Sequence, residues 1–376
     1  MKDVESIEQF ESRKVEHIRV AMDPAVQSLG AGFDSVSFVH EALPEIDFED
    51  VSISNQIFTD SKFAKDFRSP FFVSSMTAGH DDSGRLNERL AACADSEGWA
   101  MGVGSQRREL FDSGAALEWK RIRTKFPNVT FFGNIGLSQL IHTEVSVVRR
   151  LVDNLEATAL IVHLNPLQEV LQVEGTPRFR GGLLAIETLV RELGCPVVVK
   201  ETGCGISGPT AHRLFSAGVS AVDVAGRGGT HWGRIEGVRA TSNPKDAVRA
   251  KAAESLGDWG LSTVDSLRQV LQVLESSRPN ATAQPSANAI SRPEVWASGG
   301  VRTGLDGAKA LALGASQIGV AQPLMAAALK SEEDLRQVMQ RFDFELKAVL
   351  FCQGVRSLSE LRSRGQWTFL ERGGGL

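Results

Sequence analysis

The chain contains eight short apolar runs that have Gly, Ser, Asn or Thr at or near their ends. Stretches in which apolar residues recur at helical spacing follow these runs. The runs span residues 71–76, 100–105, 129–134, 159–165, 196–203, 221–229, 294–300 and 316–322. Most neighbours are separated by about 20 to 40 residues, which is room for one helix and two loops. Eight such units predict an α/β fold, a closed parallel (β/α)8 TIM barrel.

The stretches between the runs support the same architecture. Residues 86–98, 183–194 and 305–314 place apolar side chains at helical spacing and stop at Gly. The gap between the sixth and seventh runs is longer, so we expect a loop insertion and one helix over about 231–290, with an exposed tip at 276–289. We therefore predict one catalytic barrel over 69–376. Residues 1–68, with the alternating segment 51–58, are expected to form a cap on one end of it.

The bulk composition restricts the partners of the chain. Its 376 residues are 42% hydrophobic and 23% charged, which is enough for a full core. A net charge of -5 gives no electrostatic footprint for nucleic acid, so an anionic ligand needs local cations and backbone amides. There is no apolar run of membrane-spanning length and no signal-peptide pattern, so we expect no membrane contact and a cytoplasmic location. The four cysteines show no zinc-site spacing and are expected to be free thiols.

Polar side chains gather at the ends of the predicted strands. In a barrel of this kind the carboxyl ends of the strands carry the active site, although about a third of such residues can be expected to cap helices instead. The set comprises Thr77, Ser105, Gln106, Arg107, Asn134, His163, Asn165, Lys200, Glu201, Arg227, Thr230 and Arg302.

Two glycine-containing turns are candidates for a phosphate site. Residues 297–311 read as a strand, a Gly-Gly turn and a helix start, which would bring backbone amides to a phosphate at the positive end of a helix. Residues 319–323 follow the last strand, and these two loops match the phosphate site of such barrels. The loop 225–230 offers further amides but is a weak signal alone.

Two further positions carry candidate chemistry. Lys200 ends a very apolar run, so its ammonium is expected at the barrel mouth, near an anion or an electron-rich ring; an ordinary surface lysine is the alternative. Pro166 can open a short helix with Gln168 and Glu169 in its first turn. A lone carboxylate with amide neighbours suits Mg²⁺ completed by substrate phosphates, and a solvent-facing helix start is the alternative.

Together these stretches resemble type II isopentenyl diphosphate isomerase, an FMN-dependent family of isoprenoid synthesis. The resemblance covers the amino-terminal extension and the whole barrel. It rests on the ordered motifs RKVEHI, SSMTAGH, GVGSQR, GNIG, HLNPLQE, VVVKETGCGIS, DVAGRGGTHW, DWGLST and ASGGVRTGLDGAKALALGA. By itself RKVEHI (13–18) is an ordinary charged stretch, but RKVEHI together with HLNPLQE is specific to this family.

The resemblance implies roles for individual residues. The positions that match the family's FMN site are Met76, Thr77, Ala78, Ser105, Asn134, Lys200, Thr230, Gly299, Gly300, Val301, Arg302, Ala321 and Gln322. Those that match its diphosphate site are Arg13, Lys14, Arg107, His163, Asn165 and Gln168, with Glu169 as the Mg²⁺ ligand. Ala78 and Ala225 depart from the usual Gly and Ser, which puts one hydrogen bond to FMN in doubt.

The resemblance also implies a mechanism. The double bond of isopentenyl diphosphate moves without a carbonyl to stabilise an anion, so reduced FMN is expected to act as acid and base with no net redox change. NADPH is the expected reductant, and a homo-oligomer the expected assembly. Glu236 is the candidate protein partner in proton transfer, with Gln168 orienting it or the alkene; a loop carboxylate paired with Arg234 or Arg239 is the alternative.

Two rival functions remain. A 2-hydroxyacid oxidase needs a histidine base beside an arginine after strand six, where this chain has AGRGGT, so only His231 could substitute. A protein that binds flavin without turnover is the other rival, and composition does not exclude it.

Overall fold

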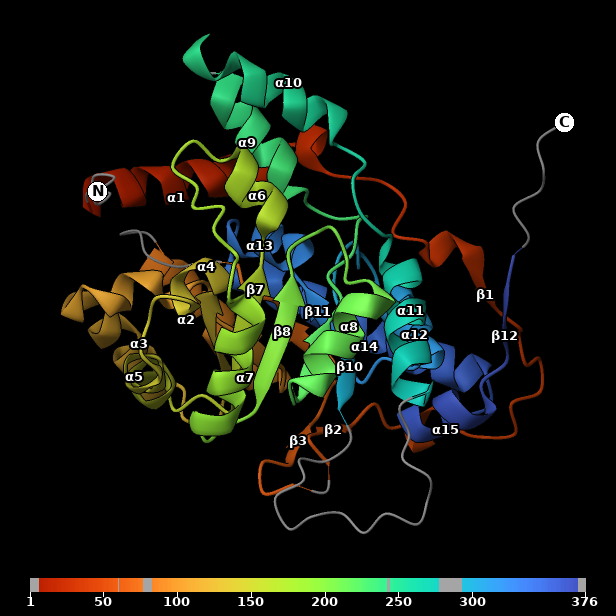
Figure 1. The fold of residues 1–376 in the computed structure, drawn as a ribbon. Helices are drawn as coiled ribbons and strands as arrows, with labels where there is room; N and C mark the ends of the chain where they lie inside the picture. Colours follow the sequence, from red (N-terminus) through yellow and green to blue (C-terminus); the bar gives the residue numbers. More distant parts are fainter. Residues whose placement is uncertain (1–6, 60, 77–82, 242–243, 277–292, 371–376) are drawn as a thin grey trace, which may run out of the picture.

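The computed structural model describes residues 7–59, 61–76, 83–241, 244–276 and 293–370, and eight parallel strands form its centre (Figure 1). The strands close into a barrel in the order β10-β11-β4-β5-β6-β7-β8-β9. They are β4 (Phe71–Val73), β5 (Ala100–Gly102), β6 (Phe131–Gly136), β7 (Ala159–Leu164), β8 (Val197–Glu201), β9 (Ala221–Asp223), β10 (Glu294–Ala297) and β11 (Gln317–Val320). All eight predicted strands and the predicted barrel are confirmed.

Helices surround the barrel and bury one face against it. In α5 the buried residues Val148, Leu151, Val152 and Leu155 follow the spacing that aligns side chains on one face of a helix. The outer helices are α2 (Ser83–Glu97), α3 (Ser113–Lys125), α4 (Leu137–Leu140), α5 (Val145–Leu155), α7 (Gly182–Glu192), α8 (Gly208–Ser216), α11 (Thr263–Ser276), α12 (Gly304–Leu313), α13 (Gln322–Ala328), α14 (Glu332–Cys352) and α15 (Leu358–Arg364). The predicted helices at 86–98, 183–194 and 305–314 correspond to α2, α7 and α12.

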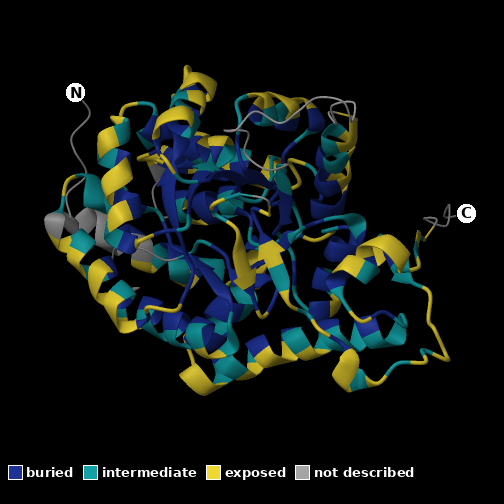
Figure 2. Ribbon diagram, turned by 90° about the horizontal axis from the view of Figure 1, so that it is seen from below, coloured by how far each residue is buried: buried dark blue, intermediate teal, exposed yellow. Residues whose placement is uncertain are grey.

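An apolar plug closes the amino end of the barrel. The antiparallel hairpin of β2 (Asn55–Ile57) and β3 (Lys65–Phe67) brings Ile57 and Phe58 against rings inside the barrel. The Trp296 ring lies 5.9 Å from that of Phe58, 5.4 Å from Phe72 and 5.1 Å from Phe132, between centroids. Figure 2, seen from below relative to Figure 1, shows the buried strands inside helices that are exposed on their outer faces.

The amino-terminal extension reaches both ends of the barrel, which corrects the expected cap on one end. Helix α1 (Ile7–Ala21) lies at the opposite end from the hairpin and contacts α9 (Trp232–Thr241), which in turn packs on α6 (Pro166–Leu171) and α10 (Ala247–Ser255) (Figure 1). Between them, β1 (Val36–Phe38) pairs with β12 (Trp367–Phe369) near the carboxyl terminus. Of the alternating segment 51–58, only Asn55–Ile57 forms a strand.

Within the range 231–290, the expected helix is α11, but the expected loop insertion is corrected, since α9 and α10 account for most of its described part. Helix α9 was missed because its buried positions are mainly small or polar and give no apolar stripe. Its Gly237 packs closely on α10: a Cβ there would lie 2.5 Å from that of Ala253. The expected tip lies outside the described residues, apart from Ser276 at the end of α11.

Candidate active site at the carboxyl end of the barrel

Two adjoining cavities open at the carboxyl ends of the strands, where the barrel fold places active sites. The first has an empty volume of about 1040 Å³ and the second about 780 Å³, both including open solvent. The residues that line both cavities are His17, Ser75, Met76, Lys200, Thr202 and Trp232. The two cavities are therefore parts of one site that can hold two ligands in contact.

The first cavity is walled by glycine turns that pack on each other. Gly299 and Gly300 adopt φ of 95° and 72°, in the left-handed region that favours glycine. A Cβ at Gly299 would lie 2.3 Å from the carbonyl oxygen of Gly226, and one at Gly300 2.6 Å from that of Gly228. Among the described residues, no acceptor is recorded for the backbone N–H groups of Gly299, Gly300 and Val301. This cradle can therefore offer amides to an anion.

The expected use of the α12 amino terminus as a phosphate site is wrong for its first amides. The N–H groups of Arg302 and Thr303 donate to Asp306 Oδ2 at 3.0 and 3.1 Å, and that of Gly304 donates to Glu345 Oε2 at 2.5 Å. The Thr303 side chain completes the capping box. Because these donors are already satisfied, the glycine turn that precedes them is the part left to bind an anion.

Arg302 supplies a cation to the same cavity. Its guanidinium donates to the side-chain oxygens of Gln322, at 2.9 Å, and Gln27, at 2.7 Å. Both acceptors are neutral, and within the described part of the chain no carboxylate pairs with this group. The charge is therefore held in place without being cancelled, which suits a phosphate.

Lys200 lies where the two cavities meet. The β7, β8 and β9 strands set His163, Lys200 and Asp223 side by side in register. The Lys200 ammonium lies 3.1 Å from Asp223 Oδ2 and donates to Ser298 Oγ at 2.7 Å, and Ser298 in turn donates to Asp223 at 2.8 Å. The position expected at the barrel mouth is therefore buried and ion-paired as well as lining both cavities.

The second cavity is lined mainly by polar and charged side chains. Asn134 Oδ1 and His163 Nδ1 lie 2.8 Å apart. Asn165 Nδ2 donates to Gln168 Oε1 and to Glu169 Oε1, both at 3.1 Å, and Glu169 Oε2 accepts from Thr176 N. The expected helix opened by Pro166 is α6, and it presents Gln168 and Glu169 to the cavity together with Arg13 and Arg107.

Glu236 lies behind this wall, in α9. Its Oε1 is 3.0 Å from His17 Nε2 and accepts from Gln168 Nε2 at 3.0 Å, while its Oε2 is 2.6 Å from Arg239. Burial alone would raise the pKa of Glu236, but the hydrogen bond and charge of His17, with Arg239 and Gln168, lower it to about 2. The carboxylate is thus ionised and is not among the described residues that line either cavity.

Gln172 extends the network from α6. With its amide in the orientation that satisfies both groups, it donates to Glu236 Oε1 at 3.3 Å and accepts from Arg13 at 3.0 Å. Helices α1, α6 and α9 are therefore joined by one buried set of charges and amides.

Two of the polar residues at strand ends, Glu201 and Gln106, accept hydrogen bonds from backbone N–H groups. Glu201 Oε2 accepts from the N–H groups of Thr202, Gly203 and Cys204 at 2.5 to 2.7 Å. Burial raises its pKa to about 7 although these bonds oppose the shift. Gln106 Oε1 accepts from Asn134 N at 2.9 Å. Neither lines a cavity among the described residues, in line with the expectation that some such residues serve the fold.

The structure brings most of the expected site residues together. The first cavity is lined by Met76, Lys200, Thr230, Gly299, Gly300, Val301, Arg302, Ala321 and Gln322, and also by Ala225, a non-glycine residue with φ of 38°. Ser105 and Asn134, expected with them, line the second cavity with Arg13, Arg107, His163, Asn165, Gln168 and Glu169. Thr77 and Ala78 lie outside the described residues, as does the side chain of Lys14.

Sequence reasoning assigned no role to several residues of the lining. His17 and Trp232 line both cavities, with their rings 5.4 Å apart in an edge-to-face arrangement. His17 lies in the motif RKVEHI and Trp232 in DVAGRGGTHW. Their place in these motifs was the signal in the sequence that could have identified them as site residues. Thr202 and Gln172 are further examples.

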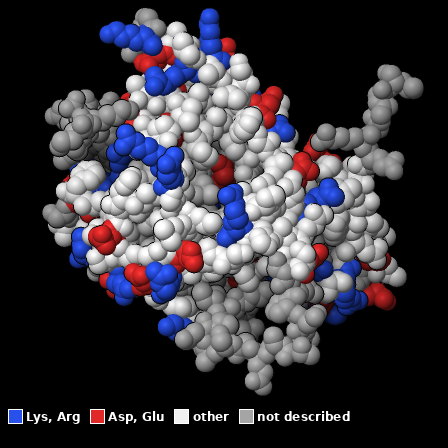
Figure 3. All heavy atoms as spheres, in the orientation of Figure 1, with Lys and Arg blue, Asp and Glu red and all other residues white. Residues whose placement is uncertain are grey.

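Other features bear on the partners and rivals. Among the described residues no group of three or more His, Cys, Asp or Glu could hold a metal, and no helix is long and apolar enough to cross a membrane. The four cysteines are free, as expected. On the face drawn in Figure 3, the described lysines and arginines are scattered among aspartates, glutamates and uncharged surface.

His231, the one histidine that an oxidase mechanism could use, is buried. Its Nδ1 accepts from Arg234 N at 3.0 Å, and burial lowers its pKa. It is absent from the described lining of both cavities, so the geometry gives it no place beside a substrate.

Several known proteins are similar to this chain. The family model for FMN-dependent dehydrogenases matches residues 168–368. The chain is 47% identical to an isopentenyl-diphosphate delta-isomerase of Bdellovibrio bacteriovorus, covering 96% of this chain and 98% of the relative. It is 47% identical to that of Legionella pneumophila strain Paris, over 95% and 97%, and 38% identical to that of Nostoc sp., over 95% of each.

Solved structures share the fold at low identity. A lactate oxidase of Pediococcus acidilactici superposes with a TM-score of 0.64 at 16% identity, covering 98% of this chain and 96% of the other. A mandelate oxidase with (S)-mandelic acid gives 0.61 at 16%, over 98% and 99%. At this identity the likeness concerns the barrel only.

Proposed function

This chain belongs to the FMN-dependent, type II isopentenyl-diphosphate delta-isomerases, and from that membership we propose that it interconverts isopentenyl and dimethylallyl diphosphate by a proton shift that uses reduced FMN. The observation that carries the proposal is the pair of adjoining cavities. One is a glycine-walled cradle with Arg302, and the other is a polar cavity with Arg13 and Arg107. A flavin and a diphosphate can then meet at Lys200.

FMN fits the first cavity. The open amides of Gly299, Gly300 and Val301 and the guanidinium of Arg302 suit its phosphate, while Met76 and the glycine backbones suit a flat ring. The cradle would close if a Cβ were added at Gly300. We assign Lys200, Thr230, Ala321 and Gln322 to the same ligand. Ser105 and Asn134, in the neighbouring cavity, would contact FMN only where the two cavities join.

The substrate diphosphate is assigned to the second cavity. Arg13, Arg107 and His163 supply cations and donors, and Asn165 and Gln168 supply amides. Lys14 is a further candidate from the same motif as Arg13. Glu169 is the proposed Mg²⁺ ligand: it is the one carboxylate in the described lining of this cavity, and Mg²⁺ is commonly completed by substrate phosphates and waters. NADPH is the proposed reductant.

Reduced FMN would supply the acid and base that an unactivated alkene requires. The residues of the chain position the reactants. Trp232 and His17 line the junction of the cavities, where they can exclude water from the alkene. Gln168 is held between Asn165 and Glu236, so its amide orientation is fixed.

Glu236 remains the candidate protein partner in proton transfer. Its surroundings favour a role in which it orients the Gln168 amide. A carboxylate with a pKa of about 2 is a weak base near neutral pH. Glu236 reaches the wall of the second cavity through three of its lining residues, His17, Gln168 and Gln172, and it holds the Gln168 amide in place. We propose that Glu236 fixes Gln168 and anchors Arg239 and His17.

A homo-oligomer and a cytoplasmic location also remain proposals. Large apolar side chains are exposed near the active-site end, including Leu29, Val248 and Trp259. Such residues are compatible with contact between subunits. Light scattering on the purified chain would measure the assembly.

The proposal is tested by counting products. The purified chain is incubated anaerobically with FMN, Mg²⁺, isopentenyl diphosphate and a small amount of NADPH. We expect many molecules of dimethylallyl diphosphate per NADPH oxidised, and little product with oxidised FMN alone. Consumption of NADPH one for one with product would indicate a reductase, and flavin binding without product would indicate a binding protein.

A further inference from the structure

Three neighbouring strands each place one polar side chain in a buried triad. Lys200 is the last residue but one of β8, Asp223 is the last residue of β9, and Ser298 directly follows β10. The exposed fractions of the whole residues are 7%, 0% and 2%. Lys200 and Asp223 are paired in register, and Ser298, two residues beyond the β10 partner of Asp223, contacts both side chains.

The triad uses two of the three N–H groups of the Lys200 ammonium. One faces Asp223 Oδ2 at 3.1 Å and one donates to Ser298 Oγ at 2.7 Å. Ser298 donates its own proton to Asp223, with its Oγ 2.8 and 3.0 Å from the two carboxylate oxygens. Since Lys200 also lines both cavities, its third N–H is the one available to a ligand there.

The charge of Lys200 is therefore matched one for one. Asp223 has no other cation within ion-pair distance among the described residues, and Lys200 no other anion. Arg302, in the same cavity, differs because it is held by neutral amides. The described lining of the first cavity thus contains one lysine whose charge is cancelled and one arginine whose charge is not.

We propose that Asp223 is the counter-ion that sets the reduction potential of the bound flavin, by cancelling the charge of Lys200 while leaving its N–H as a hydrogen-bond donor. The proposal rests on the assignment of FMN to the first cavity. A lone cation beside a flavin favours its reduced, anionic form, whereas a neutral donor does not. An isomerase that returns its flavin unchanged has reason to keep the ring neutral when reduced, because a neutral ring retains a proton to give.

An ion pair that only stabilises the barrel is the competing explanation, and a charge cycle separates the two. The variants are Asp223→Asn, Lys200→Met and the double variant. The potential of bound FMN is measured by anaerobic titration with dithionite against a reference dye, and the visible spectrum of the reduced flavin reports whether its ring is neutral or anionic. Neither readout responds to a loss of stability alone.

Asp223→Asn should favour reduced over oxidised FMN at least tenfold, which is about 30 mV for two electrons, and should shift the reduced spectrum toward the anionic form. Lys200→Met should shift the ratio at least tenfold the other way. The double variant should return to within about threefold of the parent protein, because it removes both charges. Asp343→Asn, at the opposite end of the barrel, is the matched control and should leave the potential unchanged.

The double variant also protects the test against misfolding, because it leaves no buried ion unpaired. If Lys200 acted as an uncancelled cation, the double variant would shift the potential as Lys200→Met does, and the inference would be overturned. An unchanged potential in Asp223→Asn would overturn it as well. A folded parent chain that binds no FMN would instead overturn the proposed function, and the inference with it.

Discussion

Both ends of the barrel bury carboxyl groups, but they surround them with different partners. At the carboxyl end, Asp223 pairs with Lys200, and Glu236 with Arg239 and His17. At the amino end, Glu294 accepts from Trp296, Phe58 and Ser316. All of these donors are neutral. Glu201, at the carboxyl end, also accepts from neutral backbone N–H groups, so the difference between the two ends rests on the cations paired with Asp223 and Glu236.

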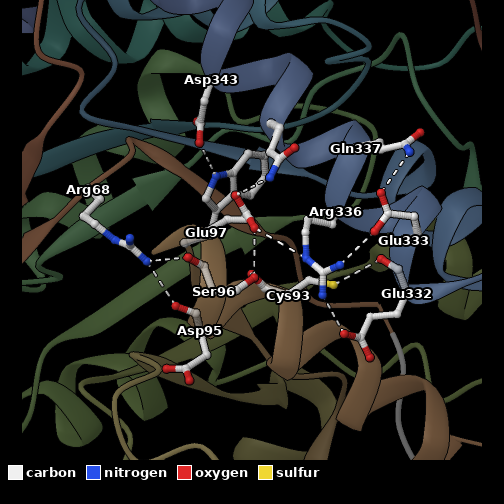
Figure 4. Close-up of polar contacts among 12 residues, drawn as sticks. Arg68, Cys93, Asp95, Ser96, Glu97, Glu332, Glu333, Arg336, Gln337 and Asp343 are labelled. Atoms are coloured by element: carbon white, nitrogen blue, oxygen red, sulfur yellow. Dashed lines mark hydrogen bonds and ion pairs between the residues drawn. The ribbon is translucent and has the colours of Figure 1, made fainter.

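Asp343 follows the same pattern at the amino end. Its oxygens accept from Ser69 Oγ at 2.6 Å and Trp99 Nε1 at 3.0 Å; Ser69 lies two residues before β4, and Trp99 immediately precedes β5. Burial raises its pKa to about 6. Figure 4 shows Asp343 on α14 and the contacts of Arg336 with Glu332 and Glu333 in the same helix and with Glu97 of α2. Helix α14 is thus held to the segments before β4 and β5 through neutral donors, and to α2 through the Arg336–Glu97 ion pair.

The difference between the ends is tested most strongly by two tryptophans. Trp296→Ala should lower the free energy of unfolding by about 3 to 5 kcal/mol, because it removes a fully buried ring from the aromatic side chains on which the apolar plug packs. The folded fraction should bind FMN as the parent does. Trp232→Ala at the active site is the matched variant and should lower stability less while weakening catalysis. Urea unfolding measures the free energy of unfolding of each variant, and FMN titration measures its cofactor binding. Equal losses of stability in the two variants would contradict the comparison.

The neutral surroundings of Asp343 predict a pH dependence of stability. Its pKa is about 6 in the folded chain and 3.8 as the ordinary value, so the native state binds the extra proton between these values. The favourable contribution is complete below pH 3.8 and is lost as pH rises through about 6. The shift of about two units corresponds to roughly 3 kcal/mol as an upper figure.

Asp343→Asn should remove that dependence. Denaturant unfolding at intervals between pH 4 and pH 7 should show the parent losing stability relative to the variant as pH rises. A difference that is flat across this window would contradict the assignment. Isomerisation at pH 7 should be unaffected in the folded variant, since Asp343 lies outside both cavities.

The smallest effect is expected from removing one charge at the metal site. Glu169→Gln should raise the Mg²⁺ concentration needed for half-maximal activity about tenfold or more, which is about 1.4 kcal/mol, and leave FMN binding intact. Glu294→Gln, a buried carboxyl at the other end, is its control and should not change the metal requirement. An Mg²⁺ titration of each variant would decide, and an unchanged requirement in Glu169→Gln would remove that residue from the site.

The sequence predicted the barrel and much of the site because both follow local rules. Apolar runs of strand length identified β4 to β11. The polar residues toward the carboxyl ends of these strands, among them Asn134, His163 and Lys200, could be recognised as site candidates. The Gly-Gly turn at 299–300 was recognisable because few other residues fit its backbone.

What the sequence missed depends on contacts between distant segments. Helix α9 buries Gly237 and Glu236 instead of an apolar stripe, so no periodicity marked it. The partners of Glu236 come from α1 and α6, and the capping of α12 by Glu345 comes from α14. The split of the extension between the two ends of the barrel likewise needed the tertiary structure.

The most direct test of the account follows the proton itself. The chain is incubated anaerobically in heavy water with FMN, Mg²⁺, isopentenyl diphosphate and a small amount of NADPH, and the deuterium content of dimethylallyl diphosphate is measured by mass spectrometry. A proton shift at the carboxyl end of the barrel predicts solvent deuterium in the product over many turnovers per NADPH oxidised. Product formed without solvent deuterium, or full activity with oxidised FMN, would contradict the acid and base role assigned to the reduced flavin.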